Sequence, residues 1–301
     1  MKAISYLGFR TLNLAGRMAV VFLFASLLSG CGGFADMFYK LFLKPIPKEE
    51  EEQKPISDEE KALMKEVERW YLGDEPGGVI VKGKGKDMVA YLHLYSITYS
   101  IASGRREDIK REQMGLVFLA EYMNSRTTIK ARVCGNLFLS DKEILKCPII
   151  YIAGTNPLKL TEGERQNIRE YIEAGGFLIV DNLTQNDIFP FARSVEYELR
   201  EALGGNYKPF KIPLGHEIYH SYYSFPDGPP AVPGEGTNPQ GNAGVRNYWI
   251  GIEVGDRIAV LITNKGEGLG WRNNMVSVLK AGVNMIAYGL SKSPMVRRIY
   301  E

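Results

Sequence analysis

Residues 148–182 constrain the fold of this chain more than any other stretch does. Two short apolar runs, Pro148–Ala153 and Phe177–Val180, each end at turn residues, and the segment between them carries apolar residues at helical spacing. Thr161 and Glu164 have the spacing of a capping box, and a Gly-Gly pair stands where that helix should end. Unbroken apolar runs are typical of strands that are buried on both faces. The pattern therefore predicts two parallel strands joined by a right-handed helical crossover.

The same pattern predicts where a ligand would bind. Open parallel sheets bind their ligands at the carboxyl ends of the strands. Here those ends carry Thr155 and Asn156 after the first strand, and Asp181 and Asn182 after the second. These four residues are therefore candidate ligand-binding residues.

The rest of the chain extends this unit into a mostly parallel α/β sheet with helices on both faces. The apolar patterns predict further strands at 88–95 and 127–133, and helices at 107–123, 194–202 and about 273–290. Two runs around a Gly-Asp turn, Tyr248–Glu253 and Arg257–Thr263, predict a β-hairpin near the C-terminus. The basic loop Lys82–Lys86 is typical of a solvated hairpin tip. The loop at 226–244 has a length that is typical of functional or disordered loops.

The N-terminus has the features of a lipoprotein signal. Basic residues precede the apolar run Met18–Ala25, which is shorter than the roughly 20 residues of a membrane-spanning helix. Leu28–Cys31 resembles a bacterial lipobox, in which Cys31 would carry the lipid; an uncleaved anchor is the alternative. We expect a cell-envelope protein facing the periplasm or the outside, attached to either the inner or the outer membrane. The predicted parts are a signal peptide (1–30), a membrane-proximal tether (31–56), a helix and basic loop (57–87), an α/β domain (88–291) and a C-terminal tail (292–301).

Charge and cysteine content limit the partners and the chemistry. The formal net charge is +2, and no basic stripe with interleaved aromatic residues is present, so we expect no nucleic-acid partner. Once Cys31 is lipidated, Cys134 and Cys147 remain. Cys134 lies at the end of one predicted strand, and Cys147 lies just before the next strand. The two residues therefore form either a disulfide or two buried thiols.

Several motifs, taken in order, resemble one family. The motifs are Pro148–Ile152, Leu160–Glu164, Tyr171–Asn182, Pro213–His220, Arg257–Val260, Gly270–Trp271 and Gly282–Tyr288. The chain is similar over roughly 88–290 to the domain-of-unknown-function family numbered 4159, which belongs to the class I glutamine amidotransferase-like folds. The resemblance implies a flavodoxin-like sheet and an extracytoplasmic or membrane-associated setting, but no established reaction. The chain departs from the pattern at Asn182 and beside Gly270–Trp271, where acidic residues are expected.

An amidotransferase needs a cysteine on the sharp turn after a strand, with a histidine to take its proton. The turn after Phe177–Val180 carries Asp181 and Asn182 instead, with no cysteine or serine. We therefore expect no glutamine hydrolysis by a thiolate.

The run His216–His220, spelled HEIYH, matches the zinc-protease pattern. That motif works on a long helix, which presents both imidazoles to one metal. Proline and glycine before the run and Pro226 after it leave little room for such a helix. His216, His220 and Asp181 could nevertheless bind a metal, orient a ligand or act as acid and base. The alternative is that both histidines hydrogen-bond loop carbonyls.

The sequence thus predicts a lipid-anchored extracytoplasmic protein with a non-catalytic amidotransferase-like domain. It would bind a ligand or protein partner at the strand carboxyl ends, for example a saccharide or peptide. Tyr223 and Trp271 would offer stacking surface, although such aromatic residues more often pack in the core. No cofactor is expected, although a divalent metal fits one alternative, a hydrolase that uses His216, His220 and Asp181. Another alternative is a scaffold for an envelope complex.

Overall fold

The computed structural model describes residues 80–100, 107–185, 190–232 and 246–298. The chain divides into two units, Met1–Pro45 and Ile46–Glu301, and all the described residues belong to the second. The expected signal peptide, the tether, Cys31 and most of the loop at 226–244 lie outside the described residues. None of the helices in the described ranges is both long and apolar enough to cross a membrane.

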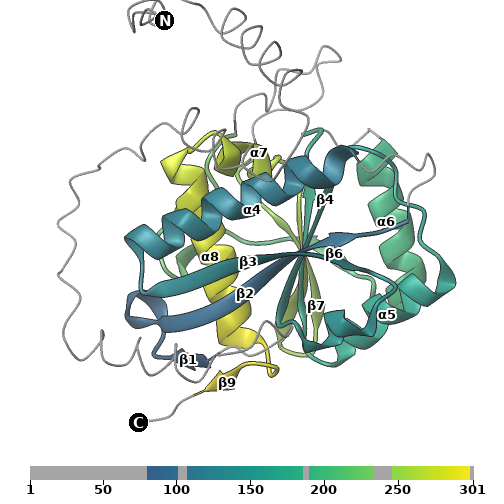
Figure 1. The fold of residues 1–301 in the computed structure, drawn as a ribbon, viewed down its shortest axis with the longest axis horizontal. Coiled ribbons are helices and arrows are strands. Elements are labelled where there is room, and N and C mark those ends of the chain that lie inside the picture. The colour runs from purple at the N-terminus through teal and green to yellow at the C-terminus, as the bar shows by residue number, and fades with distance from the viewer. Residues whose placement is uncertain (1–79, 101–106, 186–189, 233–245, 299–301) are drawn as a thin grey trace, which may run out of the picture. The chain divides into compact units, whose positions relative to one another are not determined.

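The described residues form one mixed, mostly parallel sheet (Figure 1). Its strands are β1 (Ile80–Lys82), β2 (Val89–Thr98), β3 (Ile129–Phe138), β4 (Ile149–Gly154), β5 (Phe177–Asn182), β6 (Pro209–Lys211), β7 (Ile250–Val254), β8 (Arg257–Thr263) and β9 (Arg297–Arg298). The parallel strands lie in the order β3-β2-β4-β5-β8. When these five parallel strands alone are numbered from one to five in chain order, their order in the sheet is 2-1-3-4-5. The antiparallel strands β7 and β6 follow β8 at one edge.

Helices cover both faces of the sheet (Figure 1). They are α4 (Glu107–Arg126), α5 (Glu162–Glu173), α6 (Pro190–Leu203), α7 (Glu267–Arg272) and α8 (Val276–Lys292), with short 3₁₀ segments η1 (Gly85–Asp87), η2 (Lys142–Lys146), η3 (Gly204–Asn206) and η4 (Glu217–His220). Residues of α4, α7 and α8 share one hydrophobic core, and residues of α5 and α6 share the other. We call the two sides of the sheet the α8 face and the α6 face.

Strand residues alternate between these two cores, as the pleat requires. In β5, Phe177 and Ile179 belong to the core on the α8 face, whereas Leu178 and Val180 belong to the core on the α6 face. Every residue of β5 is buried. This alternation decides on which face each functional side chain lies at the strand ends.

The helical crossover between β4 and β5 is confirmed, and its capping is local. β4 and β5 are parallel. The Thr161 side chain accepts a hydrogen bond from the Glu164 backbone N–H, and the Glu164 carboxylate accepts one from the Thr161 N–H, which completes the capping box. After the helix, Gly175 has φ +102°, the left-handed conformation that glycine adopts without strain.

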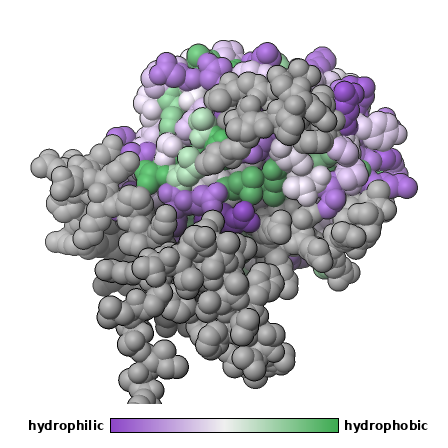
Figure 2. Space-filling model, turned by 90° about the horizontal axis from the view of Figure 1, so that it is seen from above, coloured by the Kyte–Doolittle hydropathy of each residue, from purple (hydrophilic) through white to green (hydrophobic). Residues whose placement is uncertain are grey.

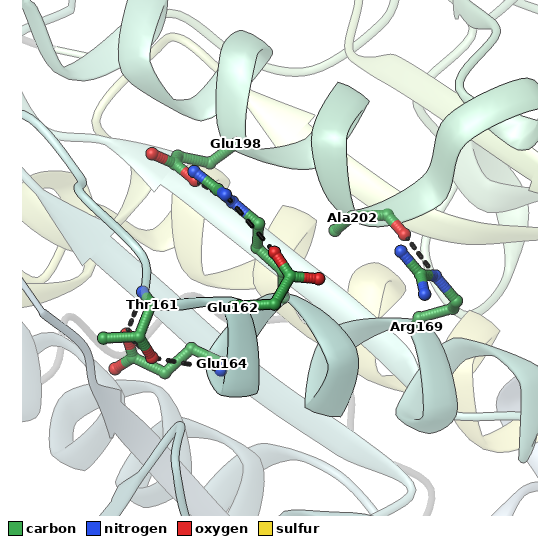
Figure 3. A network of polar contacts seen from close by, with 7 residues as sticks. Thr161, Glu162, Glu164, Arg169, Glu198 and Ala202 are labelled. Atoms are coloured by element: carbon green, nitrogen blue, oxygen red, sulfur yellow. Dashed lines mark hydrogen bonds and ion pairs between the residues drawn. The ribbon is translucent and has the colours of Figure 1, made fainter.

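Polar contacts tie α5 to α6 (Figure 3). The Arg165 guanidinium donates from Nε to the buried Glu198 carboxylate at 2.8 Å and also lies 3.5 Å from Glu162. This partnership raises the pKa of Arg165 above its ordinary value, chiefly through the hydrogen bond to Glu198. One turn further along α5, the Nε of Arg169 donates to the Ala202 carbonyl at 2.8 Å. The two helices therefore form a fixed layer on the α6 face.

The sheet extends beyond both ends of the expected domain. β1 pairs with β2 as the first strand of a hairpin, so the basic loop Lys82–Lys86 lies at the hairpin connection. β9, within the expected tail, pairs with β1. The C-terminal hairpin of β7 and β8 is confirmed around Gly255, whose φ is +69°.

Cys134 and Cys147 are two thiols, so the disulfide alternative is wrong. Cys134 lies in β3 and Cys147 precedes β4, and β2 pairs with both of these strands. Because β3 pairs with β2 along one edge of that strand, β4 must pair with the opposite edge of β2. Strands separated by one intervening strand are about 9–10 Å apart, whereas a disulfide needs Cα atoms within about 7 Å.

Seen from above, hydrophobic residues on the visible surface form small groups among hydrophilic ones (Figure 2). The large exposed hydrophobic residues of the described ranges belong to separate segments: Met114 on α4, Phe138 on β3, Tyr197 on α6 and Leu214 before η4. Singly scattered residues of this kind are ordinary for a folded surface. A binding site must therefore be sought in a cavity or a polar cluster.

Candidate functional site at the carboxyl ends of β5 and β8

The carboxyl ends of β5 and β8 lie side by side, with Asp181 paired to Thr263. Alternation sends Asp181 and Thr263 to the α8 face, and Asn182 and Asn264 to the α6 face. The same edge of the sheet therefore presents two different polar environments, one on each face. The α8 side is filled by protein, and the α6 side is open.

On the filled side, Asp181 holds the first turn of α7. Its Oδ1 accepts a hydrogen bond from the Glu267 N–H at 3.0 Å, and its Oδ2 accepts one from the Gly268 N–H at 2.7 Å. The Tyr151 hydroxyl donates to Oδ2 at 2.8 Å. The N-cap residue, Gly266, has no side chain to cap the helix, so Asp181 performs this capping from 86 positions away.

The Asp181 carboxyl has no solvent exposure. Burial raises its pKa to about 6, against the opposing effect of the hydrogen bonds from Gly268, Tyr151 and Glu267. At neutral pH the group is therefore a carboxylate enclosed by donors. Its two oxygens accept hydrogen bonds from α7 and Tyr151, so the carboxylate has a structural role. Neither Asp181 nor Asn182 offers the thiol or hydroxyl nucleophile expected at such a turn.

Two further charged residues are buried at the start of α7, one just before the helix and one in its first turn. Glu267 has no exposed surface, and its Oε1 accepts a hydrogen bond from the Trp249 indole N–H at 2.9 Å. Lys265 is equally buried, and its ammonium donates to the Arg246 carbonyl at 2.5 Å. Buried charges require partners of this kind, so the cluster closes the strand ends on the α8 face.

On the open side, Asn182 and Asn264 lead to a groove. The Asn182 amide donates to the Asn264 Oδ1 at 3.3 Å, while its own Oδ1 accepts from the Thr184 N–H and hydroxyl. Asn264 lines a cavity of about 330 Å³ between α6 and the strands β6, β7 and β8. Its lining residues are Ala192, Val195, Glu196, Tyr207, Pro209, Phe210, Lys211, Ile250, Ile262 and Asn264. We call this cavity the α6 groove.

The other predicted ligand-binding residues have different positions. Thr155 is exposed and Asn156 half-buried in the turn after β4. Trp271 is buried, packs against the Tyr151 ring at 5.4 Å and donates to the Val278 carbonyl, so it offers no stacking surface. Tyr223 is half-buried against the core, with the Lys280 ammonium 5.3 Å from its ring.

The two histidines of the HEIYH run form hydrogen bonds with nearby residues of the same segment. The run contains only the 3₁₀ segment η4, in which residues three apart, and not four apart, lie above one another. His216 Nδ1 accepts a hydrogen bond from the Ile218 N–H, and partial burial lowers the His216 pKa. His220 is within hydrogen-bonding distance of the Ser224 hydroxyl and the Leu214 carbonyl, both at 3.2 Å.

The structure does not bring His216 and Asp181 together. The His216 ring packs on Tyr288 at 5.7 Å, and the Tyr288 hydroxyl accepts a hydrogen bond from the N–H of Ile258, at the start of β8. Asp181 pairs with Thr263 at the end of the same strand. Across the described ranges, no three His, Cys, Asp or Glu side chains are grouped so as to hold a metal ion.

A family described as "Domain of unknown function (DUF4159)" matches residues 93–290, well over half of the chain. The chain belongs to this family. The match begins within β2, at His93, and contains the other parallel strands through β8, the strand-end cluster and the α6 groove. It ends at Leu290, before β9, and begins after β1.

Comparisons with curated proteins and with solved structures give no further argument about the function of the domain. No curated protein matches the chain. Among solved structures, the flavodiiron protein from Giardia intestinalis matches with 12% sequence identity and a TM-score of 0.27. The match covers 79% of this chain and 43% of that one, and at this TM-score it carries no argument about the DUF4159 domain.

Sequence reasoning found Asp181 and Asn182 but missed Lys265, Glu267 and Asn264. These three follow the apolar run of β8, and the rule that led to Asp181 applies equally to that strand. Glycines at 266, 268 and 270 are typical of a loop and give no helical pattern. They form α7 instead, and the short helix buries the charged residues around it.

Proposed function

We propose that the chain is a lipid-anchored binding protein of the cell envelope, whose DUF4159 domain binds a ligand or protein partner at the strand carboxyl ends. The domain would be flavodoxin-like and related to the class I glutamine amidotransferases, without their thiolate chemistry. The parallel strand order 2-1-3-4-5 supports this assignment, because flavodoxin-like sheets have the same order.

The α6 groove is the observation that carries the binding function. It opens at the edge of the sheet where α/β proteins bind their ligands, beside the ends of β8 and β6. Its volume of about 330 Å³ lies at the small end of the range for ligand pockets, and its lining combines apolar side chains with a few polar ones.

The hydrogen bonds that Asp181 already makes support a non-catalytic role for the turn after β5. A general acid or base must reach the proton that it moves. Asp181 is enclosed by α7 and Tyr151, so a substrate would have to displace three hydrogen bonds to meet it. The hydrolase alternative has no comparable support, since His216 lies at the other end of β8.

The envelope location rests on the sequence alone. The apolar run Met18–Ala25 and the lipobox-like Leu28–Cys31 support lipidation at Cys31. An anchored binding domain of this kind would face the periplasm or the outside of the cell.

Native mass spectrometry of the full chain, released from membranes in mild detergent, tests the binding function. We expect an adduct in the mass range of a small molecule, or of a protein if the partner is one. The variant Ala192→Trp should lose the adduct, because the indole would fill the α6 groove. An adduct that survives this change unaltered would place binding elsewhere, and wild-type protein without any adduct would count against the proposal.

A further inference from the structure

The lining of the α6 groove indicates a class of ligand, provided that the groove has the binding function proposed above. The walls of the groove are apolar on two opposite sides. Val195 comes from α6, while Ile250 and Ile262 come from β7 and β8, and all three belong to or pack against the core on the α6 face. A groove of this composition takes up a hydrophobic body by excluding water from it.

Strand alternation places Lys211 over this apolar floor. Lys211 pairs with Ile250, and Pro209 with Ile252, so these residues lie on the α6 face, whereas Phe210 lies over Gly251 on the other face. The Lys211 ammonium lies 4.5 Å from the centroid of the Tyr248 ring. This cation–π contact keeps an exposed lysine near the groove.

The charge of Glu196, the acid in the lining, is offset by a neighbour. Arg200 donates to Glu196 at 2.7 Å across one helical turn, and its guanidinium also lies 5.4 Å from the centroid of the Tyr207 ring. Lys211 has no comparable carboxylate partner among the described residues. The lining of the groove therefore has an excess of positive charge at the Lys211 end.

Two neutral side chains that line the groove, Tyr207 and Asn264, carry hydrogen-bond donors. Partial burial, and secondarily Glu196, raise the pKa of the Tyr207 phenol, which therefore keeps its proton at neutral pH. The Asn264 Oδ1 accepts from Asn182, which leaves the NH₂ group of Asn264 as a donor. An anionic group has ionic and hydrogen-bonding partners here, whereas a cation would meet Lys211 without compensation.

We propose that the α6 groove binds a small organic anion, with its apolar or aromatic body between Val195 and Ile262 and its carboxylate or similar group at Lys211. The body would replace water on the apolar walls, and Lys211 would select the charge. Because Lys211 is exposed, its ammonium would contribute a moderate preference for the anion over a neutral analogue, of about fivefold.

Three matched probes test the charge preference: 2-naphthoate, the neutral 2-naphthamide and the cationic 2-naphthylmethylamine. Titration calorimetry of the full chain in mild detergent should show tighter binding of naphthoate than of naphthamide by about fivefold, and weakest binding of the amine. Lys211→Met, which keeps the apolar stem, should bring the ratio of naphthoate to naphthamide close to one. Lys211→Arg should retain the preference.

Two control variants separate this inference from the proposed function. Lys159→Met removes an exposed lysine outside the groove and should leave all three affinities unchanged. Ala192→Trp should abolish the binding of every probe, because it fills the groove. Equal binding of the three probes, lost in Ala192→Trp, would overturn the anion preference but leave the groove as a binding site. Absence of naphthoate binding to the wild type would overturn the ligand class, while the adduct measured by native mass spectrometry decides the binding function independently.

Discussion

A carboxylate without any exposed surface is stable only where donors replace the water it has lost, and Asp181 meets three of them. Two are backbone N–H groups at the start of α7, and the third is the Tyr151 hydroxyl. In the class I glutamine amidotransferases, to which we propose the domain is related, this turn would carry the nucleophile. In this protein Asp181 links β5, to which it belongs, with β4 and α7. We therefore expect that replacing Asp181 lowers the free energy of unfolding.

Asp181→Asn places an NH₂ group against one of the backbone N–H donors. We expect the free energy of unfolding to fall by about 2–3 kcal/mol. Tyr151→Phe should lower it by about 1.5–3 kcal/mol, because the carboxylate loses one of its hydrogen bonds. Denaturant unfolding monitored by circular dichroism measures both effects. Asp141→Asn is the matched control, since Asp141 caps η2 at the surface and asparagine caps about as well. A loss in Asp181→Asn no larger than in this control would contradict the capping role.

The raised pKa of Asp181 predicts a pH dependence of stability with a definite sign. The folded-state pKa of about 6 exceeds the unfolded value of roughly 3.9, so between these pH values the folded state binds more protons. This group's contribution to the free energy of unfolding therefore falls as pH rises from about 4 to about 6, by about 3 kcal/mol, and stays constant above that range.

Denaturant unfolding of the wild type and Asp181→Asn at a series of pH values measures this contribution, because the other titrating groups cancel in the difference. We expect the wild type's stability advantage over the variant to be largest near pH 4 and smallest near pH 7. An advantage that stays constant across the range would show that the hydrogen bonds fully offset burial in setting the pKa, and one that grows with pH would show that they outweigh it.

At the scale of elements, the sequence predicted best what depends on nearby residues. The β4–α5–β5 crossover was predicted because its apolar periodicity, its capping box and Gly175 all lie within 35 residues of one another. α7 was missed, since the residue that caps it lies 86 positions away and its own sequence is rich in glycine.

The edge strands of the sheet and the candidate site could likewise be predicted only where nearby residues determine them. β1 and β9 are short and gain their regularity from each other and from β2, so periodicity does not reveal them. The strand-end rule located Asp181 and Asn182, but burial of Trp271 and the opposite placement of His216 depend on tertiary packing. The α6 groove arises between α6 and strands of a distant hairpin, and no local pattern predicts such a space.

The close approach of α4 and α7 gives a prediction at this scale. A Cβ on Gly115 would lie 2.9 Å from the Gly268 carbonyl oxygen, which is backbone and cannot turn aside. Gly115→Ala should therefore destabilise the protein by about 1–3 kcal/mol, although alanine favours helix formation by about 1 kcal/mol.

Thermal unfolding of Gly115→Ala beside Gly163→Ala measures this effect. A Cβ on Gly163, in the first turn of α5, meets nothing within 4 Å, so that variant should be neutral or more stable. If both variants gain stability equally, the α4–α7 contact is looser than the described packing requires.

At the scale of the whole molecule, the two faces of one sheet edge have separate roles. On the α8 face, Asp181, Lys265 and Glu267 are buried around α7 and stabilise the strand ends. On the α6 face, Asn264 and the α6 groove leave the same edge open. The variants Asp181→Asn on the first face and Lys211→Met on the second should therefore act independently, because the two side chains have no hydrogen-bond or ring partner in common.

The proposed attachment to a membrane concerns the chain as a whole, and Cys31 would provide it. In cells fed a labelled fatty acid, the wild-type protein should acquire the label and sediment with membranes, because a lipobox cysteine would be acylated after signal cleavage. Cys31→Ser should lose the label and retain the uncleaved signal, visible as a larger mass on a gel. Cys134→Ser is the matched control, since Cys134 lies within β3 of the folded domain, and it should keep label, processing and membrane association. Label that persists in Cys31→Ser, or disappears in Cys134→Ser, would exclude Cys31 as the sole lipid-bearing residue and remove the basis for an envelope-anchored binding protein.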